Sequence, residues 1–132
     1  MKEKDLHFYS DPSYFNNMKN SYLLRVKEEI ARLKICFIHN LDTNNFQKEI
    51  SLYVICFLLR KCIELKLIKE NSFLKIANSI IHSHYVSYYD DGTLNVKSDY
   101  DIKNKREGVY INISFIEELE ANVDKYLKED LI

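Results

Sequence analysis

Apolar residues recur with a helical period in two long stretches of the chain, which the polar break 39–45 separates. In the first stretch they form one stripe on a helical wheel, made by Leu23, Val26, Ile30, Leu33 and Phe37. Asp11 and Pro12 are typical of a helix start, because aspartate caps the first turn and proline suits the first helical position. The pattern therefore predicts a helix over 12–38, with a weak point at Asn16-Asn17.

The second stretch, 46–68, differs because it is apolar almost all the way round. One side carries Phe46, Ile50, Tyr53, Val54 and Phe57, and the rest is covered by Leu52, Ile55, Cys56 and Leu59. A helix of this kind has to be enclosed by the rest of the domain or by a partner. We therefore expect it to be the central helix, with a second copy of the chain as a possible cover.

The polar break offers two starts for this second helix. With Asp42 as the cap, Leu41 and Phe46 are placed to form a hydrophobic staple. With Asn44 as the cap, Gln47 stands where a capping box needs it. Either start leaves so short a connection that the two helices have to be antiparallel neighbours.

The pattern changes in the second half of the chain. Residues 73–81 fit a short third helix, and a strand is the alternative. Asp91-Gly92 lies between two alternating stretches, 84–89 and 93–100, which is a strong signal for a β-hairpin. A two-residue loop there would put five side chains on one face of the hairpin, namely Tyr85, Ser87, Tyr89, Leu94 and Val96.

Residues 101–108 form a polar loop, and alternation over 109–113 predicts a third strand. Ser114 and Glu117 have capping-box spacing at the start of a last amphipathic helix. The inward positions of that helix are Ile116, Leu119, Val123 and Tyr126.

Together these elements predict one α+β domain over 1–132, with a long antiparallel helical hairpin, a short third helix, a three-stranded antiparallel meander and a C-terminal helix. Its parts are a polar N-terminal arm (1–11), a helical part (12–83), the β-meander (84–113) and the C-terminal helix (114–132).

Composition agrees with a single globular domain, since 46% of the 132 residues are hydrophobic and 30% are charged. The net charge of −1 argues against nucleic-acid binding driven by overall charge. The charge is uneven, however, because residues 109–132 hold 2 basic and 6 acidic side chains. We interpret this acidic end as the solvated face of the last helix, with a partner surface as the alternative.

The three cysteines, Cys36, Cys56 and Cys62, lie in apolar stretches and show no C-x-x-C spacing. They are best interpreted as buried free thiols of a protein in a reducing compartment. The N-terminus lacks the apolar region of a signal peptide, and the longest apolar run, 52–59, is too short to span a bilayer. We therefore expect a cytoplasmic protein without membrane contact.

The first chemical candidate is Arg32 with His39, which share one face of the first helix two turns apart. A guanidinium can hold a phosphate and an imidazole can move a proton. The R-x6-H spacing resembles the motif of HEPN ribonucleases, small helical domains that build a composite site across a dimer. This two-residue resemblance implies metal-independent RNA cleavage with Arg32 and His39 as catalytic residues. The alternative is structural, with Arg32 paired to Glu28 and His39 ending the helix.

The second candidate is His82 with His84. On a strand both imidazoles would point the same way, and Asp90, Asp91 or Asp99 could add a carboxylate to a metal site. If residue 82 is still helical, the two rings diverge. In the two-residue hairpin register His84 lies opposite Asp99, which fits an ordinary cross-strand pair.

The third candidate is a binding surface on the hairpin and the loop after it, formed by Tyr85, Tyr88, Tyr89, Lys103, Lys105 and Arg106. Aromatic side chains interleaved with basic ones can form a stacking platform for single-stranded nucleic acid. Three helices followed by a hairpin also resemble a winged-helix DNA-binding protein, in which the hairpin is the wing.

The sequence contains no P-loop and no G-x-G-x-x-G, G-x-S-x-G or H-E-x-x-H motif, and we expect no cofactor. Our leading hypothesis is a non-enzymatic protein-interaction module, such as an inhibitor, immunity or accessory protein of a bacterium or its mobile elements. The apolar central helix, the tyrosines and the acidic last helix favour binding of another protein. A HEPN-like ribonuclease toxin and a winged-helix-like nucleic-acid binder are the alternatives.

Overall fold

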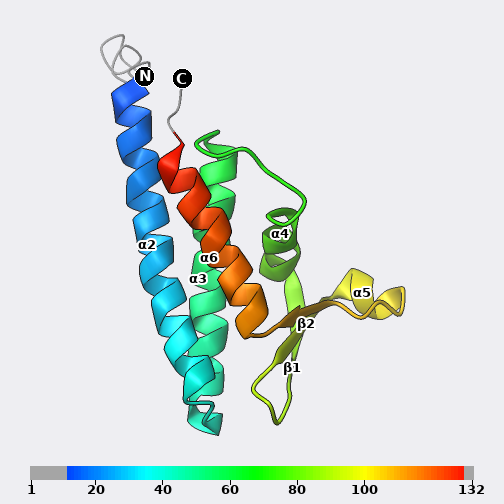
Figure 1. The fold of residues 1–132 in the computed structure, drawn as a ribbon. Coiled ribbons are helices and arrows are strands. Elements are labelled where there is room, and N and C mark those ends of the chain that lie inside the picture. Colours follow the sequence, from blue (N-terminus) through cyan, green and yellow to red (C-terminus); the bar gives the residue numbers. More distant parts are fainter. Residues whose placement is uncertain (1–11, 130–132) are drawn as a thin grey trace.

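A computed structural model describes residues 12–129, so the predicted polar arm 1–11 lies outside the described residues (Figure 1). The helical part comprises α2 (Pro12–Ile38), the 3-10 turn η1 (Asp42–Asn44), α3 (Asn45–Glu64) and α4 (Lys75–Ile81). The remainder comprises β1 (Ser83–Tyr88), β2 (Leu94–Ser98), α5 (Asp99–Lys103), β3 (Val109–Ile111) and α6 (Ile113–Lys128). The predicted α+β fold is confirmed, and residues 75–81 are helical rather than a strand.

α2 and α3 form the predicted antiparallel hairpin, and α6 lies along it (Figure 1). α2 is unbroken at Asn16-Asn17. Four of the five predicted stripe positions on α2 are completely buried, and Phe37 is partly buried. The inward positions predicted for α6 are all buried as well, which are Ile116, Leu119, Val123 and Tyr126. The helical period therefore located most of the core correctly.

α3 begins and ends differently from the prediction. It follows η1 directly, and the side chain of Asn44 makes no capping hydrogen bond. Its end comes at Glu64 rather than at 68, because Lys66 adopts a left-handed conformation with φ 59°. The amides of Lys66 and Leu67 then bond to the carbonyls of Ile63 and Cys62, which is a Schellman ending. The apolar residues Leu67 and Ile68 are still buried, so they prolonged the apparent helical pattern.

A buried lysine ties the helical hairpin to the β-hairpin. The Lys48 ammonium donates to Asn40 Oδ1 at 3.0 Å and to the Gly92 carbonyl at 3.1 Å, and it lies 4.5 Å from the centre of the Phe37 ring. Burial lowers the pKa of Lys48. Gly92 has φ 91°, and a Cβ at that position would approach Asn40 Oδ1 to 2.6 Å. The two turns therefore fit together only with glycine at position 92.

The three strands form an antiparallel sheet in the order β1-β2-β3, as predicted, but the register of the hairpin differs. The Tyr89 amide bonds to the Thr93 carbonyl at 3.0 Å, so the loop has three residues and ends at the left-handed Gly92. Val86 therefore faces Val96, and Tyr88 faces Leu94. The predicted common face was wrong, because a shift of one residue turns the whole first strand over.

The predictions for residues 99–103 and for the start of the last helix also need correction. Residues 99–103, predicted to end a strand and open a loop, form the short helix α5, which a capping box of Ser98 and Asp101 begins. α6 is capped by Asn112, whose side chain accepts from the Phe115 amide at 3.0 Å, rather than by Ser114. No described helix is long and apolar enough to cross a membrane.

Candidate functional site

One face of the sheet packs on the core, and the other carries a group of exposed tyrosines. The inner face contributes Leu94, Val96 and Ile111, all nearly or fully buried. On the outer face Tyr85, Tyr89 and Tyr110 are 48%, 48% and 44% exposed. We call this outer surface the tyrosine face; its members are Tyr85, Ser87, Tyr89, Asn95, Lys97 and Tyr110.

The centre of the tyrosine face is held by contacts between the strands. The rings of Tyr89 and Tyr110 lie 6.3 Å apart, centre to centre, at an angle of 41°. Asn95 lies on the same side but is only 3% exposed, and its side-chain amide donates to the Glu107 backbone carbonyl at 2.8 Å. The neighbouring Tyr89 hydroxyl raises the pKa of Tyr110, and burial and Glu107 add to the effect. These contacts hold the buried polar side chain of Asn95 in a fixed position beneath the aromatic rings of the face.

The rim of the face is formed by α5 and the loop after it. A hydrogen bond to the Asp99 carboxylate raises the pKa of Tyr85. At the same end a pocket of about 300 Å³ is lined by Lys97, Asp101, Ile102, Lys105, Arg106, Glu107 and Tyr110. The Arg106 guanidinium lies 4.8 Å from the centre of the Tyr100 ring and donates to its hydroxyl at 3.3 Å. The rim therefore mixes both signs of charge with aromatic surface.

The structure separates the residues that the sequence grouped as a binding surface. Tyr85 and Tyr89 belong to the tyrosine face, and Lys103, Lys105 and Arg106 are exposed in α5 and its loop. Tyr88 lies on the opposite side of the sheet, where its hydroxyl donates to Glu49 of α3.

Tyr110 was missed as a binding residue. The alternation of Val109, Tyr110 and Ile111 was visible in the sequence, and it placed Tyr110 opposite the apolar side of the third strand. Only the register of the sheet shows that this side is shared with Tyr85 and Tyr89.

Arg32 and His39 are not joined by any hydrogen bond or ion pair within residues 12–129. The Arg32 guanidinium donates to Glu29 Oε1 at 2.7 Å, rather than to the predicted partner Glu28. Glu28 lies 3.9 Å from Arg25 instead. His39 comes directly after the last residue of α2 and is exposed.

His82 and His84 diverge. His82 ends α4, and its Nε2 lies 3.3 Å from Arg60 Nη1 of α3. His84 lies at the irregular start of β1, and its Nε2 is 3.9 Å from Asp99 Oδ2. The described residues contain no group of three or more side chains that could hold a metal ion.

The cysteines are buried in the core, and acidic residues of α6 form ion pairs within the chain. All three cysteines are free and buried, and burial raises the pKa of Cys56 and of Cys62 to about 12. On α6, Asp124 pairs with Lys27 at 2.7 Å and Glu120 pairs with Lys34 at 2.6 Å. Part of the acidic face of α6 therefore fastens that helix to α2.

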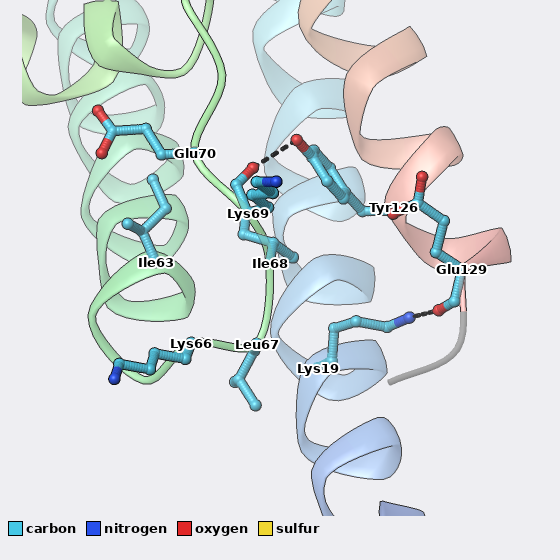
Figure 2. Close-up of a pocket in the computed structure, with 9 residues that line it drawn as sticks. All are labelled: Lys19, Ile63, Lys66, Leu67, Ile68, Lys69, Glu70, Tyr126 and Glu129. Atoms are coloured by element: carbon cyan, nitrogen blue, oxygen red, sulfur yellow. Dashed lines mark hydrogen bonds between the residues drawn. The ribbon is translucent and has the colours of Figure 1, made fainter. Parts of the chain in front are cut away.

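A pocket of about 370 Å³ lies at the other end of the molecule, between α2, the loop after α3 and the end of α6 (Figure 2). Lys19, which is only 2% exposed, donates to the Glu129 carbonyl. The Tyr126 hydroxyl donates to the Lys69 carbonyl at 2.6 Å. Figure 2 shows both bonds closing one side of the pocket, where they hold the end of α6 in place. The tyrosine face, by contrast, presents three tyrosines whose side chains are 44–48% exposed.

Comparison of the chain with protein-family models, curated proteins and solved structures gave no significant match.

Proposed function

We propose that the protein is a non-enzymatic interaction module that binds another protein through the tyrosine face. In the biological setting that we propose, it acts as an inhibitor, immunity or accessory protein of a bacterium or its mobile elements. The observation that carries the proposal is the exposure of Tyr85, Tyr89 and Tyr110 together on one open sheet face. Tyrosine is enriched at protein interfaces because it offers a large ring and a hydroxyl at low entropic cost.

The electrostatics of the rim favour a protein partner over a nucleic acid. Residues 99–107, which are α5 and the loop after it, hold three basic and three acidic side chains. A phosphate backbone needs a surplus of positive charge, whereas a protein surface can match both signs.

The partner can be identified by site-specific photo-crosslinking. A photoreactive amino acid at Lys97, on the central strand of the tyrosine face, would trap a protein that covers this face in the cell of origin. Binding of the purified partner is then measured by calorimetry with the double variant Tyr89→Ser/Tyr110→Ser. Because tyrosine is enriched among interface hot spots, whose truncation costs about 2 kcal/mol or more, we expect affinity to fall at least about 100-fold.

A control is Tyr14→Ser on α2, a tyrosine outside the tyrosine face, which should leave the affinity unchanged. Equal affinity of the double variant and the wild type would contradict the proposal. RNA cleavage that is lost in Arg32→Ala or His39→Ala would replace the proposal with the ribonuclease hypothesis. Salt-dependent binding of single-stranded RNA or DNA, lost in the same double tyrosine variant, would replace it with nucleic-acid binding.

A further inference from the structure

The outward side of α3 carries a stripe of aromatic and aliphatic residues. Phe46, Ile50 and Phe57 are 72%, 41% and 60% exposed, and Tyr53 lies half-buried on the same side. With about 200 Å² per large side chain, the three exposed residues leave roughly 300 Å² of apolar surface open, which is on the scale of functional patches. We call these four residues the α3 stripe.

The free edge of β1 is a second unpartnered feature. Because the Tyr89 amide bonds to Thr93, the alternation of an antiparallel ladder points the backbone groups of Val86 and Tyr88 away from β2. Neither residue makes a backbone hydrogen bond outside the sheet within residues 12–129. Free edges are usually blocked by charge, proline or short length, yet β1 has six residues without Lys, Arg, Asp, Glu or Pro.

The α3 stripe and the edge of β1 are neighbours. The Tyr53 hydroxyl bonds to the Ser83 carbonyl at 3.2 Å, and the Tyr88 hydroxyl bonds to Glu49. β1 therefore runs along α3 in the opposite direction, beside the stripe. A strand added to this edge would lie against the stripe as well.

We propose that a second copy of the chain occupies this surface in a two-fold dimer. The axis passes near Val86, so that β1 pairs with β1 of the second copy and the two sheets become one sheet of six strands. In the same arrangement the two α3 helices lie antiparallel. Phe46 of each copy then packs against Phe57 of the other, with Ile50 and Tyr53 between them.

The spacing of the stripe favours a second copy over an unrelated partner. Phe46, Ile50, Tyr53 and Phe57 are separated by four, three and four residues, which reads the same in both directions. An interface with two-fold symmetry requires a patch that is complementary to itself, and this spacing meets the requirement because it places Phe46 opposite Phe57 of an antiparallel copy.

The lack of charged residues near the proposed axis also favours a second copy of the chain. Residues near a two-fold axis meet their own copies, so charged side chains there would repel one another. Val86, Ile50 and Tyr53 are all uncharged. The stripe supplies a little over a third of the roughly 800 Å² that a partner typically buries in a stable interface, and the strand edge with its tyrosines adds the rest.

The dimer has a consequence for the tyrosine face. A two-fold axis perpendicular to the sheet keeps the outer faces of both copies on one side. The two tyrosine faces would then join into one surface of six strands. The dimer itself rests on α3 and β1, and it does not depend on the proposed function.

The dimer is tested by sedimentation velocity of the full chain over a range of concentrations. We expect a monomer–dimer equilibrium for the wild type. The Phe57→Glu variant should weaken dimerisation at least about 100-fold, because the interface contains this position twice and each copy buries a charge. The control Leu24→Glu replaces a similarly exposed apolar residue of α2 (54%) and should dimerise like the wild type.

Strand pairing has its own readout. In the proposed register residue 85 of one copy faces residue 87 of the other, at a distance that a disulfide can join. A mixture of Tyr85→Cys and Ser87→Cys chains should form a crosslinked dimer on oxidation more readily than either variant alone. A wild type that stays monomeric up to about 1 mM, the weak end of specific association, would overturn the proposal. A dimer insensitive to Phe57→Glu, or without the 85–87 crosslink, would overturn it too.

Discussion

α6 and α3 both pack against α2, but of the two only α6 has its apolar side covered by the rest of the chain. α6 is amphipathic: its apolar side is buried, and two acidic residues at its edge pair with lysines of α2. α3 also buries an apolar side, yet Phe46, Ile50 and Phe57 remain exposed on its outward side. The contrast indicates that the exposed apolar residues of α3 serve a role other than packing in the core of the monomer.

The inner side of α3 strengthens this conclusion, because it contains polar residues. Lys48 and Ser51 are completely buried there, while two phenylalanines of the same helix are exposed. Burying a lysine costs stability in an isolated chain, and an exposed phenylalanine contributes little to it. Local violations of this kind concentrate where a protein binds something.

The largest expected effect is a difference in stability between substitutions on the two sides of α3. Leu59→Ala removes a completely buried side chain and should lower the free energy of unfolding by about 2–5 kcal/mol. Phe57→Ala, two residues away on the outward side, should change it by less than about 0.5 kcal/mol in dilute solution. Urea denaturation at low protein concentration measures both values. A large loss in Phe57→Ala would mean that the stripe already belongs to the core.

The buried thiols of α3 give the next effect, which depends on pH. Burial raises the pKa of Cys56 and Cys62 from 9.0 to about 12, so the unfolded chain loses these protons first as the pH rises. Stability should therefore fall between pH 9 and pH 12. At pH 10 the loss is about 1 kcal/mol for each thiol, since one pKa unit separates the pH from 9.0.

The control for the thiols is Cys56→Ala/Cys62→Ala, compared by the slope of unfolding free energy against pH. The variant should be less stable at pH 8 but should lose less between pH 8 and pH 10. Parallel slopes would show that other groups cause the alkaline loss.

The third effect concerns the lysine that joins α3 to the β-hairpin. Lys48→Met keeps the apolar stem but leaves Asn40 Oδ1 and the Gly92 carbonyl without their donor. We expect a loss of about 2 kcal/mol, because buried unpaired acceptors are costly. Lys61→Met, at an exposed position of α3, is the matched control and should stay within about 0.5 kcal/mol. An unchanged stability of Lys48→Met would mean that the cost of burying the ammonium cancels its bonds.

The sequence predicted the helices better than the site, and the reason is physical. A helical stripe repeats over many residues, so the cores of α2 and α6 could be predicted from their period. The hairpin register depends on one residue: Asp91-Gly92 fits a two-residue loop, and it also fits the three-residue loop that the structure has. The alternation of polar and apolar residues does not distinguish the two loops.

The tyrosine face shows the consequence of that one-residue difference. The wrong register joined Tyr85 and Tyr89 to the apolar side of β2, whereas they lie on the opposite side with Tyr110. The exposure of the α3 stripe was equally hidden, because an apolar residue in the sequence does not show whether its neighbours reach it. That this helix needs a cover could be predicted from the sequence, and the structure shows which side is left open.

The smallest effect is expected for the ion pair that joins α6 to α2. Lys34 Nζ lies 2.6 Å from Glu120 Oε1, and both side chains are 30% exposed. A double-mutant cycle of Lys34→Ala and Glu120→Ala should give a coupling of about 0.2–1 kcal/mol, because water screens the pair. The coupling should shrink in 1 M salt, where the screening length is about 3 Å. A coupling above about 2 kcal/mol that resists salt would show that α6 is held to α2 by its charges rather than by its apolar side, and the contrast with α3 would then need another explanation.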